Sequence, residues 1–299
     1  MSFTSVVKDE VSKLELSNLE KISELSAIVQ VSEVSSYIRI ITENNSVARD
    51  VFTLFKDLFK INPLITIRKG YNYNKKILYI LDVKKNISVI LKTLGVGSLP
   101  GDFVISDEEL IRAYLRGLFM MCASINDPKT SRYHLEFNFN SQDFANFVSS
   151  LLNKFYLNSK VLSRENRFMV YIKEAEKIGD FLRIIGASKA VLYYEDIRIY
   201  RDHKNMTNRL NNCEQANVDR MIETSMNYIK DIELIKNYDY DLLNEKEKVA
   251  CLYRLKYRDV SLSELAEIIS LETGMKITKS GLYHRFKKIK EIADRVREK

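Results

Sequence analysis

A weak internal repeat in the first two thirds of the chain limits the possible folds more than any other feature. Residues 83–96 align with residues 174–187. The alignment matches apolar, basic and glycine positions: Ile87 with Ile178, Leu91 with Leu182, Lys92 with Arg183, and Gly95 with Gly186. A chain that repeats itself at this distance is expected to fold as two copies of one structural unit.

The segments before each copy follow the same predicted order of elements. The first copy predicts helices at 18–32, 45–60 and 83–96, and strands at 36–42, 64–70 and 76–82. The second predicts helices at 107–123, 142–156 and 174–187, and strands at 132–139, 159–164 and 167–173. We therefore expect an α+β domain at residues 1–200, built as a pseudo-symmetric pair of repeats at about 18–96 and 107–187.

The helix at 107–123 is apolar nearly all round and is predicted to begin with a capping box from Ser106 to Glu109. Gly117 in its middle is unfavourable for a helix. The glycine indicates either that a second helix approaches closely there, or an ordinary buried helix with a packing glycine.

The excess of positive charge lies at the end of the chain. Residues 245–299 contain 14 Lys and Arg and 9 Asp and Glu, so they supply +5 of the total net charge of +7. Residues 276–290 contain six basic residues and no acidic one. Such a run of basic residues indicates either a solvated helix face or a nucleic-acid contact. The pattern of apolar residues in the same segment decides between the two.

Three helices are predicted in residues 244–299. Asn244 with Glu247, and Ser261 with Glu264, have the spacing of capping boxes. Buried stripes are predicted in the second and third helices: Leu262, Leu265, Ala266 and Ile269, then Leu282, Phe286 and Ile289. The third helix, from about Thr278, has a basic outer face, which is typical of a helix-turn-helix DNA-binding domain. The connection LETGMKITK before it is longer than in the simplest motif.

Side-chain chemistry divides the candidate DNA contacts of the third helix into two groups. Lys279, Arg285 and Lys288 are placed to neutralise phosphates. Ser280, Tyr283, His284 and Lys287 can reach base edges, although His284 also fits an ordinary surface histidine.

Residues 201–243 are predicted to be a linker with a polar cluster followed by a connecting helix at 218–235. The cluster contains Asn205, Asn208, Arg209, Asn211, Asn212 and Asn217. One interpretation is a loop with capping asparagines. Another is that Arg209 and the asparagines contact DNA or hold the two domains together, and we favour the holding role.

Three segments carry a resemblance to a known family. LRGLFMMCASIND resembles the LAGLIDADG helix of homing endonucleases, and the duplicated unit around it looks like that fold. Together with the helix-turn-helix, the segments LRGLFMMCASINDP with YHLEF, NMTNRLNNCEQAN and TKSGLYHRFKKI resemble the WhiA family of bacterial regulators.

The resemblance implies a sequence-specific transcription regulator linked to cell division, chromosome segregation and, in spore formers, sporulation. Its partners would be double-stranded DNA at promoter-type sites and RNA polymerase or another regulator.

Homing endonucleases use a carboxylate at the end of each LAGLIDADG helix to hold divalent cations. The resemblance places Ser32 and Cys122 at these two positions. A hydroxyl and a thiol do not replace carboxylates as ligands of hard cations. We therefore predict no catalytic residues and no cleavage.

A metal-dependent endonuclease is an alternative function, because a shift of the alignment by one residue would place Glu33 at the first of these positions. A non-specific nucleoid or protein-interaction scaffold is another.

Other functional classes find little support. The odd number of separated cysteines fits neither a disulfide framework nor a zinc module, and His134, His203 and His284 are isolated. No phosphate-binding glycine loop is present. The sequence thus predicts no metal, cofactor or small-molecule substrate.

The sequence shows no apolar stretch long enough for a membrane span and no signal peptide, so we expect a cytoplasmic, nucleoid-associated protein.

Overall fold

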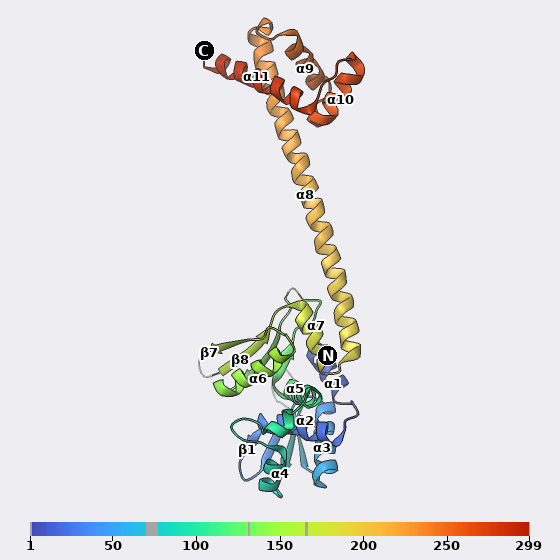
Figure 1. Ribbon diagram of the computed structural model, residues 1–299, viewed down its shortest axis with the longest axis vertical. Coiled ribbons are helices and arrows are strands. Elements are labelled where there is room, and N and C mark those ends of the chain that lie inside the picture. The colour runs from blue at the N-terminus through green and yellow to red at the C-terminus, as the bar shows by residue number, and fades with distance from the viewer. Residues whose placement is uncertain (1, 70–76, 131, 165–166, 299) are drawn as a thin grey trace. The chain divides into compact units, whose positions relative to one another are not determined.

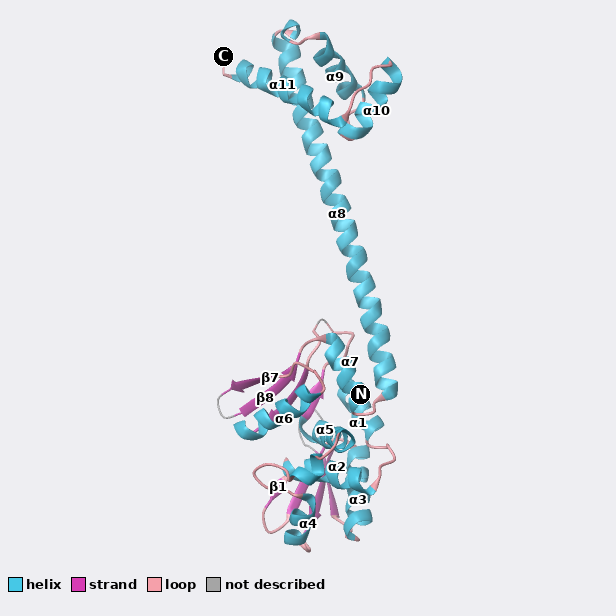
Figure 2. Ribbon diagram, viewed as in Figure 1, coloured by secondary structure: helices cyan, strands magenta, loops and turns pink. Residues whose placement is uncertain are grey.

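The computed structural model describes residues 2–69, 77–130, 132–164 and 167–298 (Figure 1). The chain divides into two compact units, Met1–Asp202 and His203–Lys299. The first unit contains two α+β repeats, and the described part of the second is helical (Figure 2). The predicted fold class, a duplicated α+β domain followed by an all-α helix-turn-helix domain, is confirmed.

Both repeats have the same order of elements and the same sheet topology. The first consists of α2 (Asn18–Gln30), β1 (Glu33–Val34), β2 (Ile38–Thr42), α3 (Asn45–Phe59), β3 (Leu64–Lys69), β4 (Ile77–Val83) and α4 (Ile87–Leu94). The second consists of α5 (Glu108–Cys122), β5 (Ala123–Ile125), β6 (Leu135–Phe139), α6 (Gln142–Lys154), β7 (Lys160–Arg164), β8 (Arg167–Ile172) and α7 (Ala175–Ile184). The antiparallel sheets have the orders β1-β2-β4-β3 and β5-β6-β8-β7, so the sequence repeat is also a structural repeat.

The sheet of the second repeat buries one face against helices. In β6 the side chains of Leu135, Phe137 and Phe139 are buried, whereas Asn138 between them is exposed, which follows the period of two in a strand. Phe137 packs edge-on against Phe181 of α7, with ring centroids 5.7 Å apart. Strands β1 and β5 were not predicted, because two or three residues are too few to show a period.

Helix α1 (Phe3–Val11) was also missed at the level of sequence. It buries Phe3, Val7 and Val11, which lie at intervals of four residues along one face. At its end the carboxylate of Glu10 accepts hydrogen bonds from the backbone N–H groups of Lys189 and Ala190, at 2.6 and 2.9 Å. Because the first N–H groups of a helix lack partners within it, Glu10 caps the start of α8 (Ser188–Tyr238).

Helices α2 and α5 pack against each other at Gly117. A Cβ atom added to this glycine would lie 2.5 Å from the carbonyl oxygen of Glu24 and 2.9 Å from the Cβ of Ala27. The first distance is far below van der Waals contact. Of the two interpretations that the sequence left open for Gly117, the close approach of a second helix is the one that the structure shows.

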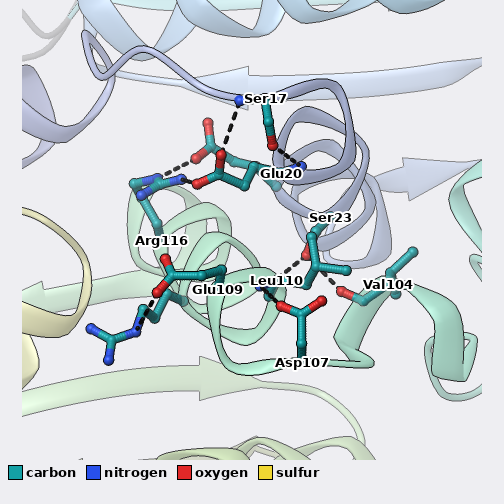
Figure 3. A network of polar contacts seen from close by, with 10 residues as sticks. Ser17, Glu20, Ser23, Val104, Asp107, Glu109, Leu110 and Arg116 are labelled. Atoms are coloured by element: carbon teal, nitrogen blue, oxygen red, sulfur yellow. Dashed lines mark hydrogen bonds and ion pairs between the residues drawn. The ribbon is translucent and has the colours of Figure 1, made fainter.

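The start of α5 differs from the prediction. Asp107, not Ser106, is the N-cap residue, and its carboxylate accepts a hydrogen bond from the N–H of Leu110 at 3.0 Å (Figure 3). Ser106 instead ends the short 3₁₀ helix η1 (Asp102–Ile105) with helical backbone angles, and an N-cap residue needs extended ones. The predicted capping box from Ser106 to Glu109 is wrong: the cap lies one residue later, and its third position is Leu110, whose apolar side chain cannot return the hydrogen bond.

A buried charged cluster lies between α2 and α5. The guanidinium of Arg116 donates a hydrogen bond to the carboxylate of Glu24 and lies 4.0 Å from that of Glu20 (Figure 3). Arg116 and Glu24 are both buried, and Asp50 of α3 lies beside Glu24. Burial raises the pKa of Glu24, against the opposing effect of Arg116. Burial and then the neighbouring Glu24 raise the pKa of Asp50 to about 9.

The raised pKa of Asp50 predicts that the first unit loses stability as the pH rises. The folded state holds this proton more tightly than the unfolded state, so stability is full below 3.8, the pKa of the free side chain, and falls up to about 9. Asp50→Asn is expected to remove much of this decline and to be more stable than the wild type at pH 8. Urea unfolding at pH 5, 6.5 and 8 measures the difference.

Asp57→Asn in the same helix is the matched control, because the hydrogen bond from Lys21 lowers the pKa of Asp57. Its difference from the wild type should be constant over this pH range. A constant difference for Asp50→Asn as well would contradict the prediction.

The remaining elements are helical. They are α8, η2 (Tyr240–Leu242), α9 (Glu245–Lys256), α10 (Leu262–Thr273) and α11 (Lys279–Arg297). The asparagine-rich segment 205–217 lies within α8, so its interpretation as a loop is wrong, and the connecting helix predicted at 218–235 is the continuation of the same helix. No helix among the described residues combines the length and apolarity needed to cross a membrane.

Candidate nucleic-acid interface

A single apolar core joins α9, α10 and α11 to the end of α8. Its fully or nearly fully buried members include Ile232, Ile235, Leu265, Ala266, Ile269, Leu282, Phe286 and Ile289. The rings of Tyr228 and Phe286 stack with centroids 4.4 Å apart, which fixes α11 against α8. The stripes predicted for the second and third helices are thus buried, except that Leu262 is only partly so.

The helix starts are set by local side-chain caps. Asn244 with Glu247, and Ser261 with Glu264, form complete capping boxes, as predicted. Thr278 caps α11 by accepting a hydrogen bond from the N–H of Gly281 at 3.1 Å. The connection between α10 and α11 spans residues 274–278, and it begins at Gly274 with a φ of +70°.

Arg254 was not singled out by the sequence, yet it is 1% exposed at the centre of this unit. Its guanidinium donates hydrogen bonds to the carbonyl oxygen of Val260 at 2.8 Å and to Oγ of Ser225 at 3.2 Å. These contacts tie the turn after α9 to α8. No local sequence signal marks Arg254, because its partners Ser225 and Val260 lie outside α9.

One face of α11 points to solvent. It consists of Lys279, Ser280, Tyr283, His284, Lys287 and Lys288, all of them exposed, and is called the outward face below. The structure thus brings together six of the seven residues predicted to contact DNA. Arg285 differs, because it is half-buried and donates a hydrogen bond to the carbonyl oxygen of Lys246 in α9 at 3.3 Å.

The electrostatics of the outward face favour an anionic partner. Within the described residues, Lys279, Lys287 and Lys288 form no ion pair, so their charges are not neutralised inside the chain. The face begins at the N-terminus of α11, where the aligned peptide dipoles add partial positive charge. A phosphate backbone matches both features.

A groove of about 610 Å³ separates α11 from the last turns of α8. Tyr283 and Lys287 of the outward face line one side of it, and Thr224, Asn227 and Lys230 of α8 line the other. The sequence did not predict that α8 would border this face.

The two positions that matter for cleavage lie at equivalent places in the repeats. Ser32 follows the end of α2 and Cys122 ends α5, and both line one cavity of about 560 Å³. The Oγ of Ser32 donates to the carbonyl oxygen of Ile28 at 2.6 Å, and the thiol of Cys122 donates to that of Leu118 at 3.2 Å. Each side chain is turned back onto the helix that carries it.

The cavity at Ser32 and Cys122 is poorly suited to a divalent cation. Burial raises the pKa of the Cys122 thiol to about 12, so it stays protonated at neutral pH. Glu33 accepts a hydrogen bond from the hydroxyl of Tyr37 at 3.2 Å and does not line the cavity, whereas Asp143 does. Across the described residues, no three His, Cys, Asp or Glu side chains form a group that could hold a metal ion.

Arg68, Lys69 and Arg167 are exposed strand residues of the hairpins in the first unit. His134 contacts the carboxylate of its neighbour Glu136, with Nε2 and Oε2 3.0 Å apart.

Three family models match successive parts of the chain. The WhiA N-terminal LAGLIDADG-like domain matches residues 11–97, the WhiA LAGLIDADG-like domain matches 111–204, and the WhiA C-terminal HTH domain matches 207–293. Together they span both repeats and the helical unit.

Whole proteins and a solved structure match over the same length. The probable cell division protein WhiA of Staphylococcus saprophyticus is 37% identical, with 99% of this chain and 98% of that protein covered. Its counterpart in Staphylococcus aureus (strain JH9) is 36% identical with the same coverage. The crystal structure of full-length DUF199/WhiA from Thermatoga maritima has a TM-score of 0.60 and 25% sequence identity, and 99% of each chain is covered.

Proposed function

The chain belongs to the WhiA family, and we propose that it is a sequence-specific DNA-binding transcription regulator. The observation that carries the proposal is the outward face of α11. Its unpaired lysines and polar side chains are exposed on a helix whose other side is buried in a helix-turn-helix core. The relatives are named as probable cell division proteins, and we propose the same process for this protein.

In the proposed complex, α11 enters the major groove of duplex DNA. Lys279 and Lys288 neutralise phosphates, and the guanidinium of Arg285 supports them from its place beside α9. Ser280, Tyr283, His284 and Lys287 reach base edges and supply sequence preference. The bound sites are promoter-type sequences on the chromosome, so the protein is nucleoid-associated and acts together with RNA polymerase or another regulator.

Binding across salt concentrations separates a regulator from a non-specific scaffold. A regulator prefers some duplexes over others of equal length, and Lys288→Ala weakens its binding to all of them and lowers the salt slope by about one. His284→Ala relaxes the preference among sequences. Equal affinity of the wild type for every duplex would favour the scaffold.

We further propose that the first unit does not cleave DNA, because Ser32 and Cys122 stand where paired carboxylates would be needed. Incubating the full chain with supercoiled plasmid and 10 mM Mg²⁺ or Mn²⁺ is expected to leave the plasmid uncut. The plasmid should carry a duplex that the protein binds, so that a missing site does not account for the result. Reproducible double-strand breaks, lost on adding a chelator, would favour the endonuclease alternative.

A further inference from the structure

We propose that one face of α8, formed by Asn205, Asn208, Arg209 and Asn212, is a second surface that contacts duplex DNA. It is called the amide face below. The inference rests on the proposed function, because it extends the DNA contact of α11 along α8. It also departs from the interdomain role that the sequence favoured for these residues.

The amide face is one stripe of a solvent-exposed helix. At about 100° per residue, Asn208, Arg209 and Asn212 lie within about 60° of Asn205 around the axis of α8. Every residue from 203 to 220 is exposed. Asn217 belongs to the same sequence cluster but lies about 120° away from Asn205. The helix thus separates side chains that the sequence alone groups together.

The composition of this segment is unusual for a simple spacer helix. Asparagine disfavours helix, yet five asparagines occur between 205 and 217. Among the described residues, the four side chains of the amide face form no hydrogen bond or ion pair that would offset this cost. Their donors and acceptors are therefore free for an external partner.

The chemistry of the amide face fits a duplex. An asparagine side chain can form two hydrogen bonds with adenine, and an arginine side chain can form two with guanine. Asparagine and arginine side chains also bind phosphate oxygens. Between Asp202 and Asp219 the single carboxylate is Glu214, which lies about 180° from Asn205 on the opposite side of the helix. The four residues of the amide face carry no negative charge themselves, and the nearest carboxylates in line with them are Asp202, about one turn before, and Asp219, about two turns after.

The amide face also continues the α11 site along α8. Arg209, Ala216, Arg220 and Asn227 follow one another at intervals of 7, 4 and 7 residues, so they share one side of the helix, which also carries the exposed Glu223. Asn227 lines the groove opposite Tyr283 and Lys287. At about 1.5 Å per residue, Arg209 lies about 27 Å along α8 from Asn227, which is less than one turn of B-DNA. One duplex can therefore reach both surfaces.

The test compares footprints and affinities of full-length variants. The probe is a duplex of about 30 base pairs, recovered by repeated selection from a random library with the wild-type chain. Hydroxyl-radical cleavage should reveal a protected patch from α11 and a second one within one turn of it. Arg209→Gln and Asn212→Ala are each expected to weaken binding by about tenfold and to lose only the second patch.

Asn217→Ala is the matched control, since it removes the same amide from the same exposed helix on another face. It should bind as the wild type does, and circular dichroism should show equal helix content in all variants. Footprints and affinities unchanged by Arg209→Gln and Asn212→Ala would overturn the inference, as would an equal loss for Asn217→Ala. Variants that instead shift the thermal unfolding of the chain, with binding intact, would assign the face to contacts between the units.

Failure of the inference is distinguishable from failure of the proposed function. If the selection enriches no duplex, or if Lys287→Glu leaves binding unchanged, the proposed function fails and this inference fails with it. If Lys287→Glu abolishes binding while the α8 variants give the wild-type footprint, the inference alone is wrong.

Discussion

Replacing Lys287 and Lys288 together by glutamate is expected to weaken binding to a selected duplex by at least about 100-fold near 0.1 M salt. Both lysines lie on the outward face of α11, are exposed, and form no ion pair among the described residues. The change removes two favourable contacts with the polyanion and introduces two repulsive ones. Fluorescence anisotropy at several salt concentrations measures both the affinity and the slope of its logarithm against salt.

The matched control is Lys85→Glu with Lys236→Glu, which changes the net charge by the same amount at exposed positions outside α11. It should cost far less affinity, because neither lysine lies on the outward face, and exposed charges without a direct phosphate contact are largely screened at this salt concentration. Equal losses for the two double variants would mean that overall charge, and not the outward face, is responsible for binding.

Gly117→Ala is expected to destabilise the first unit by about 2 kcal/mol or more, although alanine stabilises an ordinary helix interior by about 1 kcal/mol relative to glycine. The reversed sign arises because the added Cβ would lie 2.5 Å from the backbone oxygen of Glu24. A backbone atom inside a helix pair cannot move aside as a flexible side chain can. Differential scanning calorimetry of the full chain should show the transition of the first unit at lower temperature, with that of the second unit unchanged.

Gly97→Ala is the control in the same compact unit, because its Cβ would meet nothing closer than the carbonyl oxygen of Leu99 at 3.5 Å. It should change the transition temperature little. A neutral or stabilising effect of Gly117→Ala would contradict the close approach of α2 and α5.

The parts of the fold that could be predicted are those with strong local signals. The strand pairs and amphipathic helices of both repeats follow from hydrophobic periodicity, and the starts of α9 and α10 follow from their capping boxes. Gly117, which is unfavourable in a helix, indicated a packing role at that position, but the sequence did not decide between a close helix approach and ordinary burial.

The parts that could not be predicted depend on contacts distant in sequence or on competition between neighbours. Asp107 replaces Ser106 as the cap because both are good N-cap residues and the preceding 3₁₀ helix leaves only Asp107 extended. The charges of Arg116 and Arg254 are buried because partners from other elements surround them, and no local pattern shows such partners.

The candidate site was predictable in its residues but not in its extent. The outward face of α11 follows from the spacing of Leu282 and Phe286, which places the lysines on the other side. The groove shared with α8 and the separation of Asn212 from Asn217 depend on one uninterrupted helix from Ser188 to Tyr238. Because asparagines favour loops and helix caps, the sequence predicted a linker where the structure has this helix.

The central claim, that α11 selects sites by sequence, is tested most directly by mapping the protein on its own chromosome at nucleotide resolution. Chromatin immunoprecipitation of the wild type should give discrete peaks that share one sequence motif, and the Lys287→Glu, Lys288→Glu variant, expressed at the same level, should lose them. Uniform occupancy by the wild type, or peaks that persist in the variant, would contradict the account.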